Sequence, residues 1–355
     1  MFEGSLKKFF LQFMNRLRGR CRPQDEEREE ILDLVRDRHH PKSLVETSPL
    51  IEAAETRPDE QRSPEDYLIL GTDAYRTQDY ENALAYIFAG LQLVPQDPRV
   101  TSSLANRLGT LFKALGLDSL AIRNFDRALA LDPDCHDPLY NLGAIYFEQN
   151  KLAVAERKFR EAIRLDPKNP EYHNSLGKVY LTQKEYNKAE ESFKEAAGLN
   201  HSKADYRVNL ALVYYAREEF SKAKGQAAEA IELQADQALP RIVMGNIWFM
   251  ERKFLEAEES YRHAIQLDPK NAEIHNLLGD LYFERKHYNS AETEYKTAAD
   301  LWPGNAKAQK NLGHVYMAQE RFEKAEEAFN KSIQLDPGSA VSLIDLKIQP
   351  PKKED

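Results

Sequence analysis

Residues 276–303 read NLLGDLYFERKHYNSAETEYKTAADLWP, and the spacing of their small and apolar residues recurs along most of the chain. The template is a Leu-Gly pair followed by an aromatic residue, an alanine, a second aromatic residue, an alanine and a proline: Leu278-Gly279, Tyr282, Ala291, Tyr295, Ala298 and Pro303. A shift of 34 residues toward the N-terminus gives Met244-Gly245, Trp248, Ala257, Tyr261, Ala264 and Pro269. The opposite shift gives Leu312-Gly313, Tyr316, Ala325, Phe329, Ser332 and Pro337. A fixed period of this length indicates an array of structural repeats.

The template fits eight units, at residues 64–97, 102–135, 136–169, 170–203, 204–237, 238–271, 272–305 and 306–339. Every unit has an alanine early in its second half: Ala83, Ala121, Ala155, Ala189, Ala223, Ala257, Ala291 and Ala325. Every unit also has a leucine ten residues later: Leu93, Leu131, Leu165, Leu199, Leu233, Leu267, Leu301 and Leu335. The chain therefore contains eight versions of one pattern, and the same local structure is expected in each.

Each unit contains two apolar patterns of helical period separated by a polar turn, at about 273–285 and 289–301 in the quoted repeat. The glycine and the first alanine are expected where the two helices cross, because small side chains allow close backbone approach. Proline is expected to end the second helix, because it disfavours the helical conformation in the residue before it. One helical pair cannot bury both of its faces, so stacking of the pairs into an all-α solenoid is predicted.

The pattern resembles the signature of the tetratricopeptide repeat (TPR) family over about residues 64–339. The resemblance implies an α-solenoid of helix-turn-helix repeats that forms a superhelix with a concave surface. It also implies a role in protein–protein interaction and leaves the partner unspecified.

The second and fifth repeats depart from the template in ways that change the structure expected of them. Between Pro95 and Pro133 there are four residues more than the period, which is about one helical turn. The first helix of the second repeat is therefore predicted to begin one turn early. In the fifth repeat the substitutions remove proline, glycine and the late aromatic residue: His201, Ala235, Ala211 and Ala227. Less buried volume is expected there, and a softer joint near residues 200–235 is our hypothesis.

The bulk composition excludes several classes of protein. The net charge of −9 argues against nucleic acid as a partner, because phosphate binding requires a basic surface. Two cysteines, Cys21 and Cys135, cannot form a disulfide scaffold and favour a reducing compartment, the cytoplasm. The sequence has no apolar run long enough to span a bilayer.

Residues 1–22 form a basic amphipathic segment. Six apolar residues share one helical face: Phe2, Leu6, Phe9, Phe10, Phe13 and Leu17. Six lysines and arginines against Glu3 give the segment a charge of +5. Three readings remain open: a peripheral helix on a membrane surface, a segment that docks onto this chain, a second copy or a partner, and a disordered or targeting peptide.

The segments on either side of the repeats have other compositions. Residues 23–63 are acidic and interrupted by prolines, which is typical of a flexible linker. Alternatively, its apolar pair Leu50-Ile51 covers the open end of the first repeat. Residues 340–355 are predicted to form a short capping helix and a tail.

By the TPR resemblance, the first helix of each repeat lines a concave groove in which partner peptides lie. The residue four positions after the repeat's glycine is expected to point into it: Tyr75, Lys113, Phe147, Leu181, Tyr215, Phe249, Phe283 and Met317. Seven of these eight residues are apolar or aromatic, so an apolar binding stripe is one interpretation. The other is that they pack against the next helix and belong to the core.

Polar residues also recur on the predicted first helices. Acids open five of them, either to complement the helix dipole or as a rim that selects basic ligands: Glu65, Asp137, Glu171, Asp205 and Glu273. Asparagines, including Asn141 and Asn209, suggest a partial ladder for a peptide backbone by resemblance to some TPR superhelices. The lysine place of chaperone-binding TPR domains is matched only by Lys310, which argues against a carboxylate clamp.

The sequence has no HExxH, GxxxxGK[ST], GxGxxG, CxxC or GxSxG motif, and no catalytic residues, cofactor or metal are predicted. The sequence therefore predicts a non-catalytic scaffold or adaptor that binds a peptide or helix of another protein. The alternative is a membrane-peripheral assembly factor attached through residues 1–22.

Overall fold

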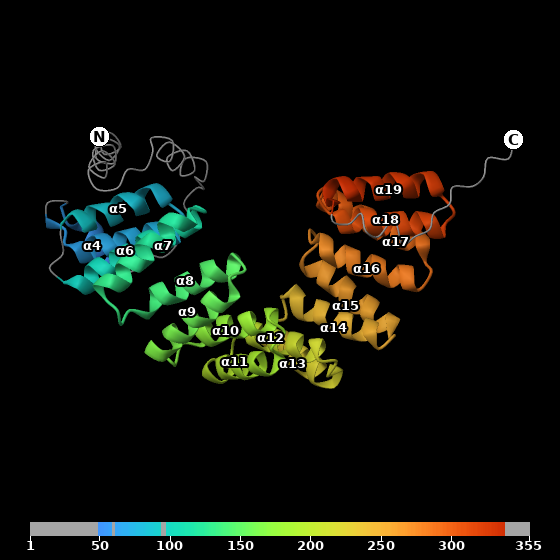
Figure 1. Ribbon diagram of the computed structural model, residues 1–355, viewed down its shortest axis with the longest axis horizontal. Coiled ribbons are helices and arrows are strands. Elements are labelled where there is room, and N and C mark those ends of the chain that lie inside the picture. Colours follow the sequence, from blue (N-terminus) through green and yellow to red (C-terminus); the bar gives the residue numbers. More distant parts are fainter. Residues whose placement is uncertain (1–48, 59–60, 94–96, 338–355) are drawn as a thin grey trace. The chain divides into compact units, whose positions relative to one another are not determined.

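The computed structural model describes residues 49–58, 61–93 and 97–337 (Figure 1). This part of the chain contains seventeen α-helices and no strand, as the all-α prediction requires. The chain divides into two compact units, Met1–Val179 and Tyr180–Asp355. The segments 1–22 and 340–355 and most of 23–63 lie outside the described residues, so the predictions made for them stay predictions.

The first unit begins with α3 (Pro49–Thr56) and continues with three helical hairpins. These are α4 (Pro64–Arg76) with α5 (Tyr80–Gln92), α6 (Pro98–Ala114) with α7 (Asp118–Leu131), and α8 (His136–Glu148) with α9 (Leu152–Leu165). Helix α10 (Pro170–Thr182) contains the boundary between the two units.

The second unit contains α11 (Tyr186–Leu199) and four hairpins. These are α12 (Ala204–Ala216) with α13 (Phe220–Leu233), α14 (Ala238–Met250) with α15 (Phe254–Leu267), α16 (Ala272–Glu284) with α17 (Tyr288–Leu301), and α18 (Ala306–Ala318) with α19 (Phe322–Leu335). Within this unit each second helix also packs on the first helix of the next repeat, which gives a continuous core.

The helix crossings form as the sequence predicts. All eight template alanines are at most 1% exposed. A Cβ added to Gly279 would lie 2.6 Å from the ring of Tyr295, and the same geometry recurs between Gly109 and Phe125. Glycine is required at these positions because the ring of the second helix occupies the place of its missing side chain.

The extra turn in the second repeat is confirmed. Helix α6 has 17 residues, whereas α4, α8, α12, α14, α16 and α18 have 13 each. It begins at Pro98, four residues before the start of the repeat frame, with Asp97 as its N-cap. The insertion therefore lengthens the helix at its N-terminus and leaves the crossing intact.

Helix α3 packs against α4, with Ile51 and Ala54 buried. The side chain of Arg62 donates hydrogen bonds to the carbonyl oxygens of Ala54 and Glu55, at 3.0 Å each, at the C-terminal end of α3. The position of Ile51 agrees with the proposal that this segment covers the first repeat.

Candidate functional site

The first-helix row comprises the eight residues predicted to line the groove, and each of them is partly buried in the structure. Tyr75, Lys113 and Phe147 belong to the first unit, and the other five belong to the second. Lys113 forms an ion pair with Glu148 at 3.0 Å, which interrupts the apolar character of the row in the first unit.

Four aromatic rings of the row contact the aromatic residue that opens the second helix of the same repeat. The ring centroids lie 5.9 Å apart for Tyr75–Tyr80, 6.1 Å for Tyr215–Phe220, 6.0 Å for Phe249–Phe254 and 5.6 Å for Phe283–Tyr288. The row therefore has a packing role within these four repeats, while part of each of the four rings remains accessible. Burial raises the pKa of the Tyr75 and Tyr215 hydroxyl groups.

The row is most continuous in the second unit. Phe249, Phe283 and Met317 pack against the same buried cluster, which includes Leu278 and Leu312. These three residues lie on α14, α16 and α18, at equal intervals of 34 residues. Three consecutive first helices thus present half-buried apolar side chains at the same position.

The asparagines do not form one uniform ladder in the described helices. The Nδ2 of Asn141 donates to Oδ1 of Asn106 at 3.1 Å, which joins α8 to α6. Asn209 is half-buried on α12. In α14, Asn246 accepts a hydrogen bond from the Tyr261 hydroxyl at 2.7 Å. These asparagines have different surroundings, and at least two of them are bound to neighbouring side chains.

Several acids at the first-helix starts bond to the next repeat. Asp137 accepts from the hydroxyl of Tyr172 at 3.1 Å, and Asp205 accepts at 3.0 Å from Gln237, the last residue of its own repeat and the N-cap of the next first helix, α14. Glu273 forms an ion pair with Lys307 at 2.9 Å. These contacts give the acids a structural role between repeats, in addition to their favourable position at helix N-termini.

The sixth and seventh repeats contain tyrosine contacts that the repeat pattern does not predict. The hydroxyl of Tyr295 donates to Oδ1 of Asp280 at 2.6 Å, as Tyr261 does to Asn246. In both repeats the acceptor directly follows the repeat's glycine. The replacement of phenylalanine by tyrosine opposite an Asn or Asp is the signal that identifies these pairs.

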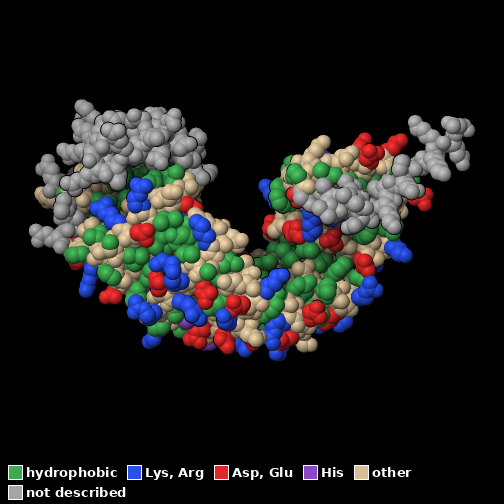
Figure 2. Space-filling model, in the orientation of Figure 1, with side chains coloured by type: hydrophobic (Ala, Val, Ile, Leu, Met, Phe, Trp, Pro, Cys, Tyr) green, Lys and Arg blue, Asp and Glu red, His purple; other side chains and the backbone are tan. Residues whose placement is uncertain are grey.

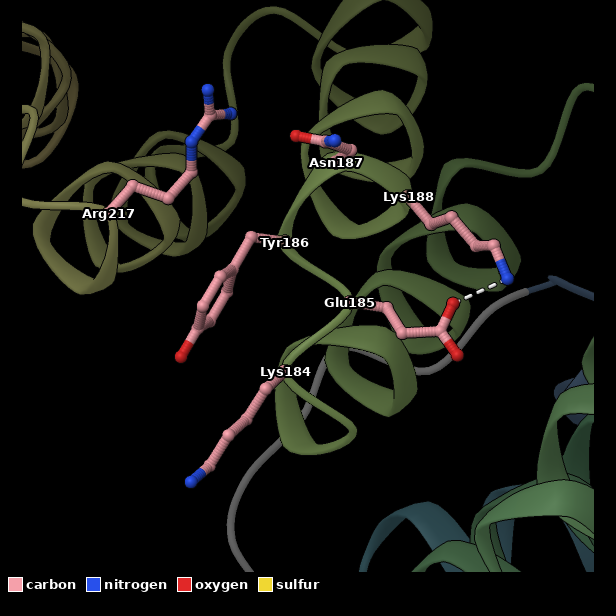
Figure 3. A pocket seen from close by; sticks show the side chains of 6 residues that line it. All are labelled: Lys184, Glu185, Tyr186, Asn187, Lys188 and Arg217. Carbon is pink, nitrogen blue, oxygen red and sulfur yellow. Dashed lines mark ion pairs between the residues drawn. The ribbon is translucent and has the colours of Figure 1, made fainter.

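A depression of about 390 Å³ in the second unit is lined by the turn before α11, by the first residues of α11 and by Arg217. Figure 3 shows that its three cationic side chains, Lys184, Lys188 and Arg217, point in different directions. Lys188 pairs with Glu185, and Arg217 pairs with Glu190 at 2.5 Å. Because these cations do not converge, the depression is a poor cradle for an anion.

A second depression, of about 430 Å³, lies in the first unit beside α3, α4 and α6. Cys135 and Asp137 line it together with an ion pair of Asp73 and Arg76 at 2.9 Å. Burial raises the pKa of the Cys135 thiol, which disfavours the nucleophilic thiolate.

Across residues 49–58, 61–93 and 97–337, no three His, Cys, Asp or Glu side chains gather as a metal site would require. Over the same residues, no helix combines the length and the apolar character needed to cross a membrane. On the face shown in Figure 2, acidic and basic side chains are intermixed on both units.

Sequence models of the tetratricopeptide repeat match several stretches of the chain: residues 143–184, 170–202, 245–286, 272–305 and 306–339. No curated protein sequence shows detectable similarity to the chain.

Solved structures share the fold at low sequence identity. A tetratricopeptide repeat protein from Parabacteroides merdae is 18% identical, with a TM-score of 0.58, over 72% of this chain and 98% of that one. A chain of the APC/C hetero-tetramer Cut9-Hcn1 is 18% identical, with a TM-score of 0.57, over 76% of this chain and 53% of that one. PilF of Pseudomonas aeruginosa is 20% identical, with a TM-score of 0.50, over 60% of this chain and 97% of that one.

The stacked hairpins with small residues at their crossings define a helical repeat protein. The chain belongs to the tetratricopeptide repeat family. Proteins of this family generally act as non-catalytic scaffolds for protein–protein interaction.

Proposed function

We propose that this protein is a non-catalytic scaffold or adaptor that binds a peptide or helix of a partner protein along its first-helix row. The proposal is supported by the partly exposed apolar side chains at one position of consecutive first helices, chiefly Tyr215, Phe249 and Phe283. Partly exposed aromatic side chains are typical anchors of protein interfaces. Helix-in-groove binding would use such a row through apolar residues spaced along one face of the partner helix.

The test is affinity capture from the source cell with the intact chain and with a variant carrying Tyr215, Phe249 and Phe283→Lys. A matched control changes three exposed apolar residues of the same unit outside the row, Met250, Leu255 and Trp302→Lys. Both variants must retain the helicity of the intact chain. Loss of specific proteins from the row variant alone supports the proposal, and equal capture by all three forms contradicts it.

The alternative is a membrane-peripheral assembly factor attached through residues 1–22. It rests on the sequence pattern of that segment, six apolar residues on one helical face and a charge of +5. Flotation with vesicles containing anionic lipid would test it. The full chain should float and the chain lacking residues 1–22 should not. If both forms remain unbound, the alternative fails.

A further inference from the structure

The depression of about 430 Å³ in the first unit is bordered by the first helices α4 and α6, which pack on each other (Figure 1). Ile51 of α3 and Leu68 of α4 give its lining apolar surface. Three side chains of α6 supply hydrogen-bond donors to the same lining: Ser103, Asn106 and Arg107. The depression therefore suits a ligand that combines apolar groups with hydrogen-bond acceptors.

Arg107 brings to the depression a positive charge that has no bonded partner. Of the other charged residues in the lining, Asp73 pairs with Arg76 at 2.9 Å, and Asp137 accepts from the hydroxyl of Tyr172 at 3.1 Å. Arg107 is partly buried and forms no ion pair or hydrogen bond with any residue that the structure describes. A guanidinium in this position favours an anionic ligand, because a bonded counter-charge offsets the cost of its partial burial.

Asn106 supplies a second, independent donor. It is 5% exposed, and its Oδ1 accepts a hydrogen bond from Nδ2 of Asn141 at 3.1 Å. Its own Nδ2 donates to no residue in the described part of the chain, and the side chain lines the open depression. Buried amide groups are almost always bonded. A carboxylate, whose two oxygens accept several hydrogen bonds, could satisfy both Asn106 and Arg107.

The site also adjoins the first-helix row. Burial raises the pKa of the Tyr75 hydroxyl, and the positive charge of Arg107 acts against this rise. Arg107 is therefore near enough to Tyr75 for its charge to be felt there. A segment bound at Arg107 would lie close to the row where the row begins.

The chain itself supplies an acidic segment next to this depression. Residues 25–37 contain seven acids and two arginines, a net charge of −5, and four apolar residues: Ile31, Leu32, Leu34 and Val35. Residues 38–48 join this segment to α3, whose Ile51 lines the depression. Such a connection of about 11 residues spans at most about 36 Å, and packed helices are about 10 Å apart. The segment can therefore reach the depression of its own chain.

We propose that residues 25–37 bind in this depression of their own chain, with a carboxylate on Arg107 and Asn106 and apolar side chains against Ile51 and Leu68. Because the segment is tethered, its effective concentration at the depression is high, and modest contacts are sufficient to hold it. The bound segment would cover the part of the row near Tyr75 and leave the row of the second unit open to partners. This binding goes beyond the proposed function and does not depend on it.

The test measures fluorescence anisotropy of a labelled peptide with the sequence of residues 23–40 on full-length protein. The amide form of the protein neutralises the seven acids of the segment: Asp25, Asp33 and Asp37→Asn with Glu26, Glu27, Glu29 and Glu30→Gln. The amide form should bind the peptide about tenfold more tightly than wild type, because its own segment no longer competes. Adding Arg107→Gln to the amide form should weaken binding about tenfold, through loss of a charge-assisted hydrogen bond.

Two controls separate the site from general charge attraction. Arg123→Gln in the amide form removes a charge from an exposed position of α7 outside the lining, and should change binding less than about twofold. A peptide that carries the same seven amides should bind none of the forms. This peptide tests the need for carboxylates with the repeats unchanged, so the test stands even if Arg107→Gln lowers the melting temperature.

The other outcomes would each overturn the proposal. Equal binding of the acidic peptide by wild type and the amide form would mean that the depression takes an acidic segment from another molecule. A wild type that elutes as a dimer beside a monomeric amide form would assign the segment to a second copy. Unchanged binding after Arg107→Gln, or no binding to any form, would show that the depression is not the site.

Discussion

The fifth and seventh repeats close the same helix crossing in two different ways. In the seventh repeat Gly279 lies against the ring of Tyr295, and both are buried. In the fifth repeat the corresponding residues are Ala211 and Ala227, each 0% exposed. The same crossing can thus be filled in two ways: by a large ring opposite a glycine, or by two small side chains.

The same two repeats show that proline does not set the end of the second helix. Helix α17 ends at Leu301, two residues before Pro303, whereas α13 ends at the equivalent Leu233 with Ala235 in the proline position. Both C-cap residues, Trp302 and Gln234, have extended backbone angles. The prediction that proline ends these helices is therefore too narrow, because α13 ends at the equivalent residue without a proline.

The ion pairs at the junctions after these two repeats have opposite orientations: one has its acid on the second helix of the repeat, and the other has its base there. Glu292 of α17 pairs with Arg321 at 2.5 Å in the next repeat. In the fifth repeat Lys224 of α13 pairs with Glu251 at 2.8 Å and lies 4.3 Å from the ring of Trp248. The polarity of the ion pair is reversed while its place between repeats is kept.

Removing the ring of Tyr295 should have the largest effect on this comparison. Tyr295→Ala should destabilise the α16–α17 hairpin by about 3–5 kcal/mol, because it leaves a cavity over Gly279. The double change Gly279→Ala with Tyr295→Ala recreates the fifth-repeat pair and should recover about 1 kcal/mol, through the better helix propensity of alanine. Hydrogen exchange of amides in α16 and α17 measures both changes. If the double change is instead less stable than Tyr295→Ala alone, the alanine pair depends on other features of the fifth repeat.

The softer joint near residues 200–235 remains a prediction. The fifth repeat has alanine where the seventh has a buried tyrosine, so its hairpin should open at a free energy roughly 2 kcal/mol lower. Native-state hydrogen exchange should find the amides of α12 and α13 less protected than those of α16 and α17. Equal protection of the two hairpins would contradict the prediction.

The ion pair at the junction after the seventh repeat should lose its stabilising effect in acid. Burial acts to raise the pKa of Glu292, but hydrogen bonds from Arg321 and Lys296 outweigh it and lower the pKa from 4.5 to about 2. A carboxylate whose pKa is lowered by folding stabilises the folded state above its unfolded pKa, and this contribution is lost as pH falls from about 4.5 toward 2. The loss should be about 1–2 kcal/mol, less than the full shift implies, because Arg321 is partly exposed.

The measurement is the stability of wild type and Glu292→Gln between pH 7 and pH 2. The variant should be less stable at neutral pH, and the difference should shrink as the pH falls. A constant difference across this range would mean that the ionised carboxylate is not the source of the stabilisation.

Sequence periodicity was sufficient to predict the hairpins, the buried alanines and the early start of α6, because these depend on backbone spacing. It was not sufficient to predict the polar contacts. The bond from Tyr295 to Asp280 joins two helices, and the unpaired amide of Asn276 follows from what surrounds it rather than from its own type. The function of the first-helix row is likewise not encoded in the repeat pattern, since the same residues pack within their repeats.

The turns inside the hairpins give the smallest expected effect. The turn between the two helices of each repeat has one residue with positive φ, and in most repeats it is not glycine: Gln78, Asn150, Lys184, Glu218, Arg252, Lys286 and Glu320. The second repeat has Gly116, with φ of 78°.

Since this conformation costs a side-chain-bearing residue roughly 1 kcal/mol, Gly116→Ala should destabilise α6–α7 by about that amount. Lys286→Gly should stabilise α16–α17 by less than 1 kcal/mol, because the gain is offset by the larger unfolded-state entropy of glycine. Melting temperatures of the two variants should shift in opposite directions, and a shift in the same direction would show that the turn side chains, rather than the backbone conformation, determine the stability of these turns.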